Sequence, residues 1–146
     1  MAEAYCVKQT KNSSVEKEFE LRAESKTVPD FRKQLSAELE KSGMPGKASQ
    51  DVLVAVSEAL TNMIRHSYES KGGKIQVAYR DYPDRIEITI RDYGKKFDAG
   101  KVPGPCLPPT EPGGLGLYLI KTLMDKVEYD PQCEKGNRLH LTKYKK

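Results

Sequence analysis

The sequence predicts an α+β domain, a two-layer α/β sandwich in which a mixed, mainly antiparallel sheet carries three main helices on one face. Three observations lead to this class. Several short segments alternate apolar and polar residues, as half-buried strands do. Three longer segments repeat apolar residues at helical spacing. Two of the alternating segments are separated only by the turn at 81–84, which predicts an antiparallel hairpin.

The length of 146 residues is that of one domain with a single core. We expect residues 1–14 to form a flexible N-terminal tail and residues 15–146 to form the domain. No apolar run is long enough to cross a bilayer, and the N-terminus lacks the basic start and apolar centre of a signal peptide. These features predict a cytoplasmic protein that does not act at a membrane.

Cysteine content and charge exclude some classes and leave others open. The odd number of cysteines, Cys6, Cys106 and Cys133, at scattered spacing argues against a zinc site or a disulfide framework. The net charge of +4 fits an anionic ligand such as a nucleotide as well as it fits nucleic acid, and it does not decide between them.

The spacing of apolar residues and a capping residue predict the first strand and the first helix. A strand with one buried face is predicted because the apolar residues Val15, Phe19, Leu21 and Ala23 all lie at odd-numbered positions and would share one side of the strand. Thr27 is expected to cap a helix that ends at Gly43.

The next segment, 51–68, predicts a long helix with two stripes. One stripe is apolar and would face the core: Val52, Val56, Ala59, Leu60, Met63 and Ile64. The second stripe is polar, and it brings together Glu58, Asn62, Arg65 and His66, because residues three and four apart are neighbours on a helix surface. The alternative for this stripe is a solvated face with ordinary charge pairs.

The second half of the chain begins where Gly72–Gly73 ends the long helix. Strands are expected at 75–79 and 86–90, followed by a proline- and glycine-rich loop at 92–114 that has the length of a lid or binding loop. Helical periodicity resumes at Leu115, so Gly113 and Gly114 would lie at a helix N-terminus, where backbone N–H groups favour phosphate. A short strand at 127–129, a turn at 131–136 and a strand through Leu139 and Leu141 complete the chain.

These motifs are weak singly, but their order is specific. The order is Glu-x-x-x-Asn-x-x-x-His on a helix, a strand ending in Asp-x-Gly, a Pro/Gly-rich loop, Gly-Gly-x-Gly-Leu opening a helix, and Gly-Asn in the closing hairpin. It resembles the GHKL superfamily of Bergerat-fold ATPases, which includes gyrase and the histidine kinases. The similarity is greatest to the stand-alone anti-sigma-factor serine/threonine protein kinases, in the segments 57–62, 65–68, 97–98 and 113–125, and it covers residues 15–144.

The resemblance implies roles for the helix residues. Glu58 matches the general base that orients or deprotonates the attacking hydroxyl. Asn62 matches the Mg²⁺ ligand, since a neutral oxygen donor suits that hard ion. Arg65 stands where related kinases place a basic residue toward the phosphates. For His66 a ligand contact and a histidine satisfied by internal hydrogen bonds are equal alternatives.

The resemblance also implies an ATP site. Asp92 matches the carboxylate that accepts the adenine amino group, and Gly94 allows the base close to the backbone. Gly114, Leu115 and Gly116 match the lid residues at the phosphates. The chain departs from the superfamily at Lys96, where a second glycine is common, and at Asn137, where many members have a threonine that helps to bind adenine. Two alternatives remain at this position: Asn137 binds adenine through its amide, or a water takes over the role of the threonine.

The implied function is an ATP- and Mg²⁺-dependent serine/threonine kinase that acts as an anti-sigma factor. Such a kinase phosphorylates an anti-sigma-factor antagonist, sequesters a sigma factor, commonly forms a homodimer, and does not bind nucleic acid directly. No dimerisation helix or second catalytic domain is evident, which argues against a sensor histidine kinase or a topoisomerase. The alternative is an ATP-binding module that holds a partner without phosphoryl transfer. A structural domain without nucleotide is the third class, and the ordered motifs oppose it.

Overall fold

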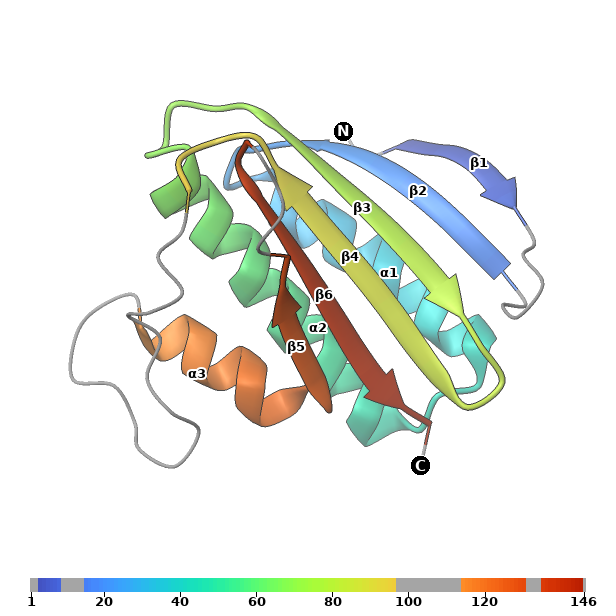
Figure 1. The fold of residues 1–146 in the computed structure, drawn as a ribbon. Coiled ribbons are helices and arrows are strands. Elements are labelled where there is room, and N and C mark those ends of the chain that lie inside the picture. Colours follow the sequence, from blue (N-terminus) through green and yellow to red (C-terminus); the bar gives the residue numbers. More distant parts are fainter. Residues whose placement is uncertain (1–2, 9–14, 97–113, 131–134, 146) are drawn as a thin grey trace.

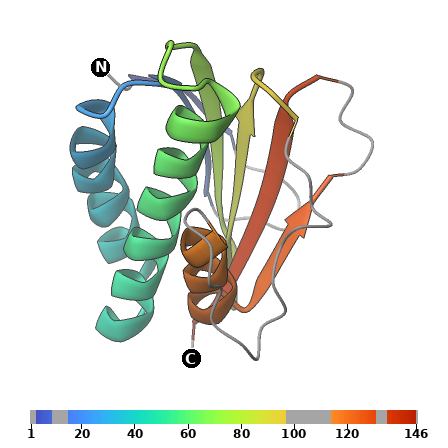
Figure 2. The ribbon, with the colours of Figure 1, turned by 90° about the vertical axis from the view of Figure 1, so that its left-hand side faces the viewer.

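The computed structural model describes residues 3–8, 15–96, 114–130 and 135–145, with the backbone alone for 3–8 and 114–117. Three helices, α1 (Thr27–Ser42), α2 (Gly46–Asn62) and α3 (Gly114–Leu123), cover one face of a six-stranded sheet (Figures 1 and 2). A π turn, η1 (Met63–Ser67), continues directly from α2. The predicted two-layer α+β class is confirmed. The lid at 97–113, including Phe97 and Asp98, and the turn residues 131–134 lie outside the described residues.

The strands are β1 (Glu3–Lys8), β2 (Val15–Arg22), β3 (Lys74–Asp81), β4 (Arg85–Asp92), β5 (Lys126–Tyr129) and β6 (Asn137–Tyr144). Their order in the sheet is β1-β2-β3-β4-β6-β5, and β3 and β4 form the predicted hairpin. Every pairing between the described strands is antiparallel, so the parallel component implied by a mixed sheet is not seen among them. This register places Asp92 at the end of β4 opposite Asn137 at the start of β6.

Two local expectations are corrected. Residues 3–8, expected in a flexible tail, form β1 and pair with β2, which gives the backbone of that strand hydrogen-bonding partners on its outer side. The division into a tail and a domain is otherwise still a prediction. Thr27 does not cap α1: it is the first helical residue and is buried, Lys26 occupies the N-cap position, and no side chain caps the helix. Gly43 ends α1 in the left-handed conformation, as expected.

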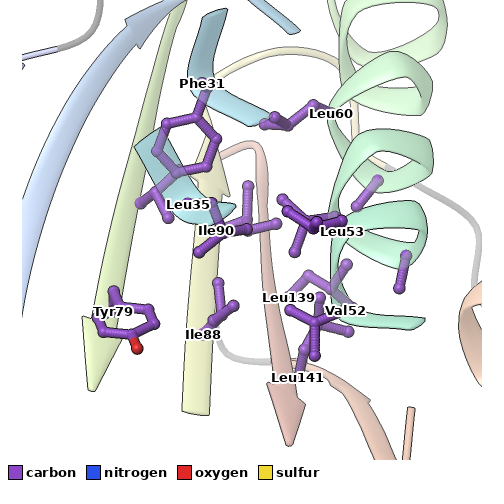
Figure 3. Packing of buried hydrophobic residues seen from close by; sticks show 14 of the residues in the cluster. Phe31, Leu35, Val52, Leu53, Leu60, Tyr79, Ile88, Ile90, Leu139 and Leu141 are labelled. Atoms are coloured by element: carbon purple, nitrogen blue, oxygen red, sulfur yellow. The ribbon is translucent and has the colours of Figure 1, made fainter. Parts of the chain in front are cut away.

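The core lies between the helices and the sheet. From β4 it takes every second residue, Ile86, Ile88 and Ile90, each at most 1% exposed. The whole apolar stripe predicted for the second helix is buried, and Figure 3 shows two of its members, Val52 and Leu60, on the side of α2 that faces the strands. Phe19 of β2 and Phe31 of α1 meet edge to face, with ring centroids 5.2 Å apart.

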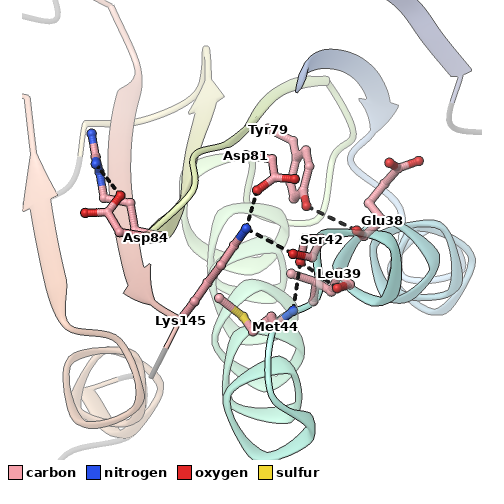
Figure 4. Close-up of polar contacts among 9 residues, drawn as sticks. Glu38, Leu39, Ser42, Met44, Tyr79, Asp81, Asp84 and Lys145 are labelled. Carbon is pink, nitrogen blue, oxygen red and sulfur yellow. Dashed lines mark hydrogen bonds and ion pairs between the residues drawn. The ribbon is translucent and has the colours of Figure 1, made fainter. Parts of the chain in front are cut away.

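Polar contacts hold the two layers together at the edge of this core (Figure 4). Lys145 donates to the Asp81 carboxylate at 2.6 Å and to the Ser42 carbonyl oxygen at 3.0 Å, so it joins the sheet to the end of α1. The Tyr79 hydroxyl donates to the Glu38 carbonyl oxygen at 3.3 Å. Within the described part of the chain, none of the helices has the length and apolar character needed to cross a membrane.

Candidate nucleotide site

The helix that carries the predicted polar stripe changes from α-helical to π-helical hydrogen bonding in the middle of that stripe. The sequence predicts one helix over 51–68, whereas α2 begins earlier, at Gly46, and gives way to the π turn after Asn62. In that turn the Tyr68 N–H donates to the Met63 carbonyl oxygen at 3.0 Å, five residues back. Apolar spacing cannot distinguish this turn from an α-helical one, because Met63 and Ile64 are buried in either case. Single π turns inside helices are frequent at functional sites.

The change of winding separates the four residues of the stripe into two pairs. Glu58 and Asn62 lie one turn apart on α2 and are half-buried. Arg65 and His66 lie in the π turn and are exposed. None of the four side chains makes a hydrogen bond or ion pair with another described residue. Glu58 and Asn62 thus keep the predicted spacing, while Arg65 and His66 do not continue it.

At the neighbouring strand end, Asp92 is fully buried, with 0% of its surface exposed. Its carboxylate accepts from the Gly94 N–H at 3.0 Å and lies 3.2 and 3.3 Å from the Asn137 amide nitrogen. That amide nitrogen also lies 3.1 Å from the Ser67 hydroxyl and 2.8 Å from the Lys95 carbonyl oxygen. The structure therefore brings Asp92, Gly94 and Asn137 together, and it ties them to the π turn.

Two glycines allow the backbone to approach this cluster. A Cβ on Gly94 would lie 2.2 Å from the Ser67 carbonyl oxygen, the same oxygen to which the Lys95 N–H donates at 2.6 Å. Gly136 has φ +73°, and a Cβ there would lie 2.1 Å from the Asp92 carbonyl oxygen. The room that Gly94 leaves is thus used, in this structure, by the π turn.

Three residues of this cluster were missed by sequence reasoning: Ser67, Tyr68 and Tyr129. Burial raises the pKa of Tyr129 in β5, and the nearby charge of Asp92 raises it further. Burial likewise raises the pKa of Tyr68, with a smaller contribution from Asp92. The only signal for Ser67 and Tyr68 is their place directly after Arg65 and His66, because the contacts that join them to Tyr93 and Asn137 link residues distant in sequence.

The lid glycines can be placed only by their backbone. Gly114 is the first residue of α3, so the predicted helix start is confirmed, and Leu115 and Gly116 belong to its first turn. Helix α3 lies beside α2, and the last turns of α2 and the first turn of α3 both lie toward the left in Figure 1. That these residues contact phosphate is still a prediction. A hollow of about 390 Å³ elsewhere on the sheet is lined by Arg80, Glu87 and His140 among others, and by none of the candidate residues.

Comparison with known proteins agrees with the fold. Residues 21–143 match the family of the histidine kinase-like ATPase domain. The chain is 36% identical over 136 residues to the serine-protein kinase RsbW of Oceanobacillus iheyensis, covering 87% of this chain and 85% of the relative. It is 33% identical to the protein of the same name from Bacillus subtilis, covering 92% and 88% of the two chains, and 37% identical to that from Bacillus licheniformis, covering 84% and 81%.

The chain belongs to the histidine kinase-like ATPase domain family. The resemblance inferred from the ordered motifs is therefore confirmed, both for the superfamily and for the stand-alone serine kinases within it.

Proposed function

We propose that this protein is an ATP-dependent serine/threonine protein kinase that acts as an anti-sigma factor. The observation that supports it best is the buried Asp92 cluster, tied through Ser67 to the helix that carries Glu58 and Asn62. This arrangement combines a carboxylate that can bind the nucleotide base with a metal ligand and a general base one turn apart on a neighbouring helix. Such a combination is suited to phosphoryl transfer.

The residues around Asp92 fit a nucleotide base. An ionised carboxylate can accept roughly four hydrogen bonds. Among the described residues only the Gly94 N–H and the Asn137 amide donate to Asp92. Because a buried carboxylate is costly unless its acceptor positions are used, the remaining capacity suits the amino group of adenine. In this proposal the Asn137 amide donates to the Asp92 carboxylate and orients it, so Asn137 takes part in binding the nucleotide base indirectly, through that carboxylate.

The donor set also fits Mg²⁺ held jointly with ATP. The described residues contain no group of three or more His, Cys, Asp or Glu side chains that could hold a metal alone. Mg²⁺ commonly takes one or two protein ligands and completes its shell with phosphate oxygens and waters. Asn62, half-buried and without another side-chain partner among the described residues, supplies one neutral oxygen for this purpose.

Glu58 is the proposed general base. It lies one helical turn before Asn62, so a serine hydroxyl brought to the terminal phosphate would meet this carboxylate first, and Glu58 would orient it and accept its proton. Bound ATP with Mg²⁺ supplies the phosphoryl group. Arg65 and His66, exposed on the π turn, are proposed to face the phosphates or the incoming protein. Gly114, Leu115 and Gly116 are proposed to meet the phosphates with the N-terminal N–H groups of α3.

The proposed partners are proteins. The relatives are named serine-protein kinases, which supports phosphorylation of a serine on a protein substrate. By resemblance to the anti-sigma-factor kinases, that substrate is an anti-sigma-factor antagonist, and the chain sequesters a sigma factor as a homodimer in the cytoplasm.

The first prediction separates nucleotide binding from phosphoryl transfer at Glu58. Glu58→Gln keeps size and hydrogen bonding, so it should leave ATP affinity nearly unchanged and lower transfer by roughly 10² to 10⁴ fold, as for a lost acid–base group. Asn62→Ala should lose Mg²⁺-dependent affinity and transfer together. The measurements are ATP affinity by calorimetry and transfer of labelled phosphate to purified small proteins of the anti-sigma-factor-antagonist class.

A matched control is Glu20→Gln, which removes a half-buried carboxylate on β2, on the strand face opposite the core residues Phe19 and Leu21. It should change neither quantity. Transfer at the wild-type rate by Glu58→Gln would contradict the proposed base. ATP binding by the wild-type chain without transfer to any candidate would instead favour the non-catalytic binding module.

A further inference from the structure

The Tyr68 hydroxyl joins three segments that meet beside Asp92. Tyr68 directly follows the π turn. Its hydroxyl accepts from the Tyr93 N–H at 2.7 Å and donates to the Lys74 carbonyl oxygen at 2.5 Å. Tyr93 is the residue after Asp92, and Lys74 begins β3. One side chain therefore fixes the end of the polar helix, the start of one strand and the backbone next to the buried carboxylate.

The chain around Tyr68 is shaped to admit its ring. A Cβ on Gly73 would lie 2.2–2.6 Å from three ring carbons of Tyr68, so only glycine leaves the space that the ring occupies. The intervening Glu69 and Ser70 have φ of +50° and +61°, the left-handed region that non-glycine residues seldom adopt. Such conformations persist only where the surroundings enforce them, and they cluster at functional sites. The Ser70 N–H, which donates to the Ile64 carbonyl oxygen at 2.8 Å, is one such constraint.

The hydrogen-bonding roles of the hydroxyl are set by the groups it meets. The Tyr93 N–H can only donate and the Lys74 carbonyl can only accept, so the hydroxyl must use both its lone pair and its proton. Burial raises the pKa of Tyr68, and the proton needed for the bond to Lys74 therefore stays in place at neutral pH.

We propose that Tyr68 is a positioning residue for the nucleotide base, acting through the Tyr93 backbone on the Asp92 carboxylate and the Gly94 N–H. Asp92 is the last residue of β4, so apart from the bond between its own carboxylate and the Gly94 N–H, the chain beyond it needs a fixed point from outside the strand. The Tyr68 hydroxyl supplies that fixed point from one side, while the contact of Lys95 with the Ser67 carbonyl supplies it from the other. The inference rests on the proposed nucleotide site and adds a residue to it.

A positioning role and a purely structural role differ in what they change. Loss of a positioning contact weakens the interactions that Asp92 makes with the base, which ATP and ADP share, and it leaves chemistry at the terminal phosphate intact. Loss of a structural contact lowers stability without a selective change in base binding.

The test is Tyr68→Phe, which keeps the ring and removes the hydroxyl. We expect ATP and ADP affinity, measured by calorimetry, to fall equally, by about five- to tenfold, because the Tyr93 N–H and the Lys74 carbonyl lose a shared partner. The rate of transfer at saturating ATP should be unchanged. Tyr82→Phe is the matched control, since it removes a hydroxyl from the turn between β3 and β4, at the far end of both strands, and it should alter nothing.

A double-mutant cycle with Asp92→Asn supplies the decisive comparison. If Tyr68 acts through Asp92, Tyr68→Phe should weaken ADP binding much less when Asp92 is already replaced. Gly73→Ala, which keeps the hydroxyl but displaces the ring, should reproduce the loss of affinity and serves if Tyr68→Phe folds poorly. Unchanged affinity in both variants, or full additivity with Asp92→Asn, would overturn the proposal. Failure of the wild-type chain to bind either nucleotide would overturn the proposed function itself.

Discussion

At the scale of single residues, Asp92 combines two conditions that seldom occur together. Its carboxylate is fully buried, yet among the described residues its donors are one backbone N–H and one side-chain amide. A buried charge with so few donors needs a further partner to offset its desolvation. This makes Asp92 the residue whose replacement most directly tests the nucleotide site.

Asp92→Asn should weaken ATP and ADP binding by about 1.5 to 3 kcal/mol, the usual contribution of a hydrogen bond to a charged group. Calorimetry measures it, and thermal unfolding shows whether the fold is retained. Asp84→Asn, in the exposed turn at the other end of the sheet, is the control for loss of one negative charge. Equal affinity of wild type and Asp92→Asn would remove this residue from the site.

The extent to which the site could be predicted differs between its residues. Asp92, Gly94 and Asn137 were found because each belongs to a short motif whose position in the chain is characteristic, and the structure brings all three together. The contacts of Ser67 and Tyr68 with the rest of the cluster reach residues 25 or more positions away or cross the Gly72–Gly73 turn, and no spacing rule connects such partners. Arg65 and His66 lie exposed in the π turn, which apolar spacing does not reveal.

At the scale of secondary structure elements, the residue before β6, Gly136, is as important to the site as the side chains that form it. Gly136 precedes Asn137, and its backbone lies against the Asp92 carbonyl oxygen. The left-handed φ of +73° and the close contact both require glycine. The strand β6 can therefore pair with β4 in the register that opposes Asn137 to Asp92 only if this position lacks a side chain.

Gly136→Ala should lower the free energy of unfolding by clearly more than Gly43→Ala, which is its matched control. Gly43 has nearly the same φ, +77°, but a Cβ there would meet nothing within 4 Å. The alanine at 43 should therefore cost about 1 kcal/mol from the backbone conformation alone. The alanine at 136 should add a steric cost and weaken ADP binding by displacing Asp92. Chemical denaturation and calorimetry measure the two effects, and equal losses in both variants would contradict this account.

The elements themselves were largely predictable, with informative exceptions. β2, β3, β4 and β6 alternate fully buried with partly buried residues near their centres, which is the signal that periodicity detects. β1 was expected to be a tail because six residues of mixed character carry little signal, and its formation depends on the free edge of β2. The π turn was missed because an i to i+5 hydrogen bond leaves the apolar positions of Met63 and Ile64 unchanged.

At the scale of the whole molecule, the two layers are joined by a core and by polar contacts at its rim. The sandwich class was predictable because helices with one apolar stripe must cover a sheet with one apolar face. The polar contacts were not predictable, since Lys145 and Ser42 are 103 residues apart. Tyr79 belongs to both systems: its ring is in the core, at 1% exposure, and its hydroxyl reaches the Glu38 carbonyl of α1.

This position makes Tyr79 a source of alkaline instability. Burial, followed by repulsion from Asp81, raises the pKa of Tyr79 well above its ordinary value of 10.0. The unfolded chain therefore loses this proton at a lower pH than the folded protein does. The contribution of Tyr79 to stability is fully present below about pH 10 and is lost as the pH rises toward the folded-state pKa.

Tyr79→Phe should consequently flatten the fall in stability at high pH. It should lower the free energy of unfolding at pH 7, because the bond to Glu38 is lost, but the difference from wild type should shrink by about 1.4 kcal/mol between pH 9 and pH 11. Urea denaturation at a series of pH values measures this difference directly, and contributions from Tyr68, Tyr129 and the lysines cancel in it. Tyr82→Phe should follow the wild-type profile. A Tyr79→Phe curve parallel to wild type over the whole range would show that the hydroxyl ionises as readily in the folded protein as in the unfolded chain.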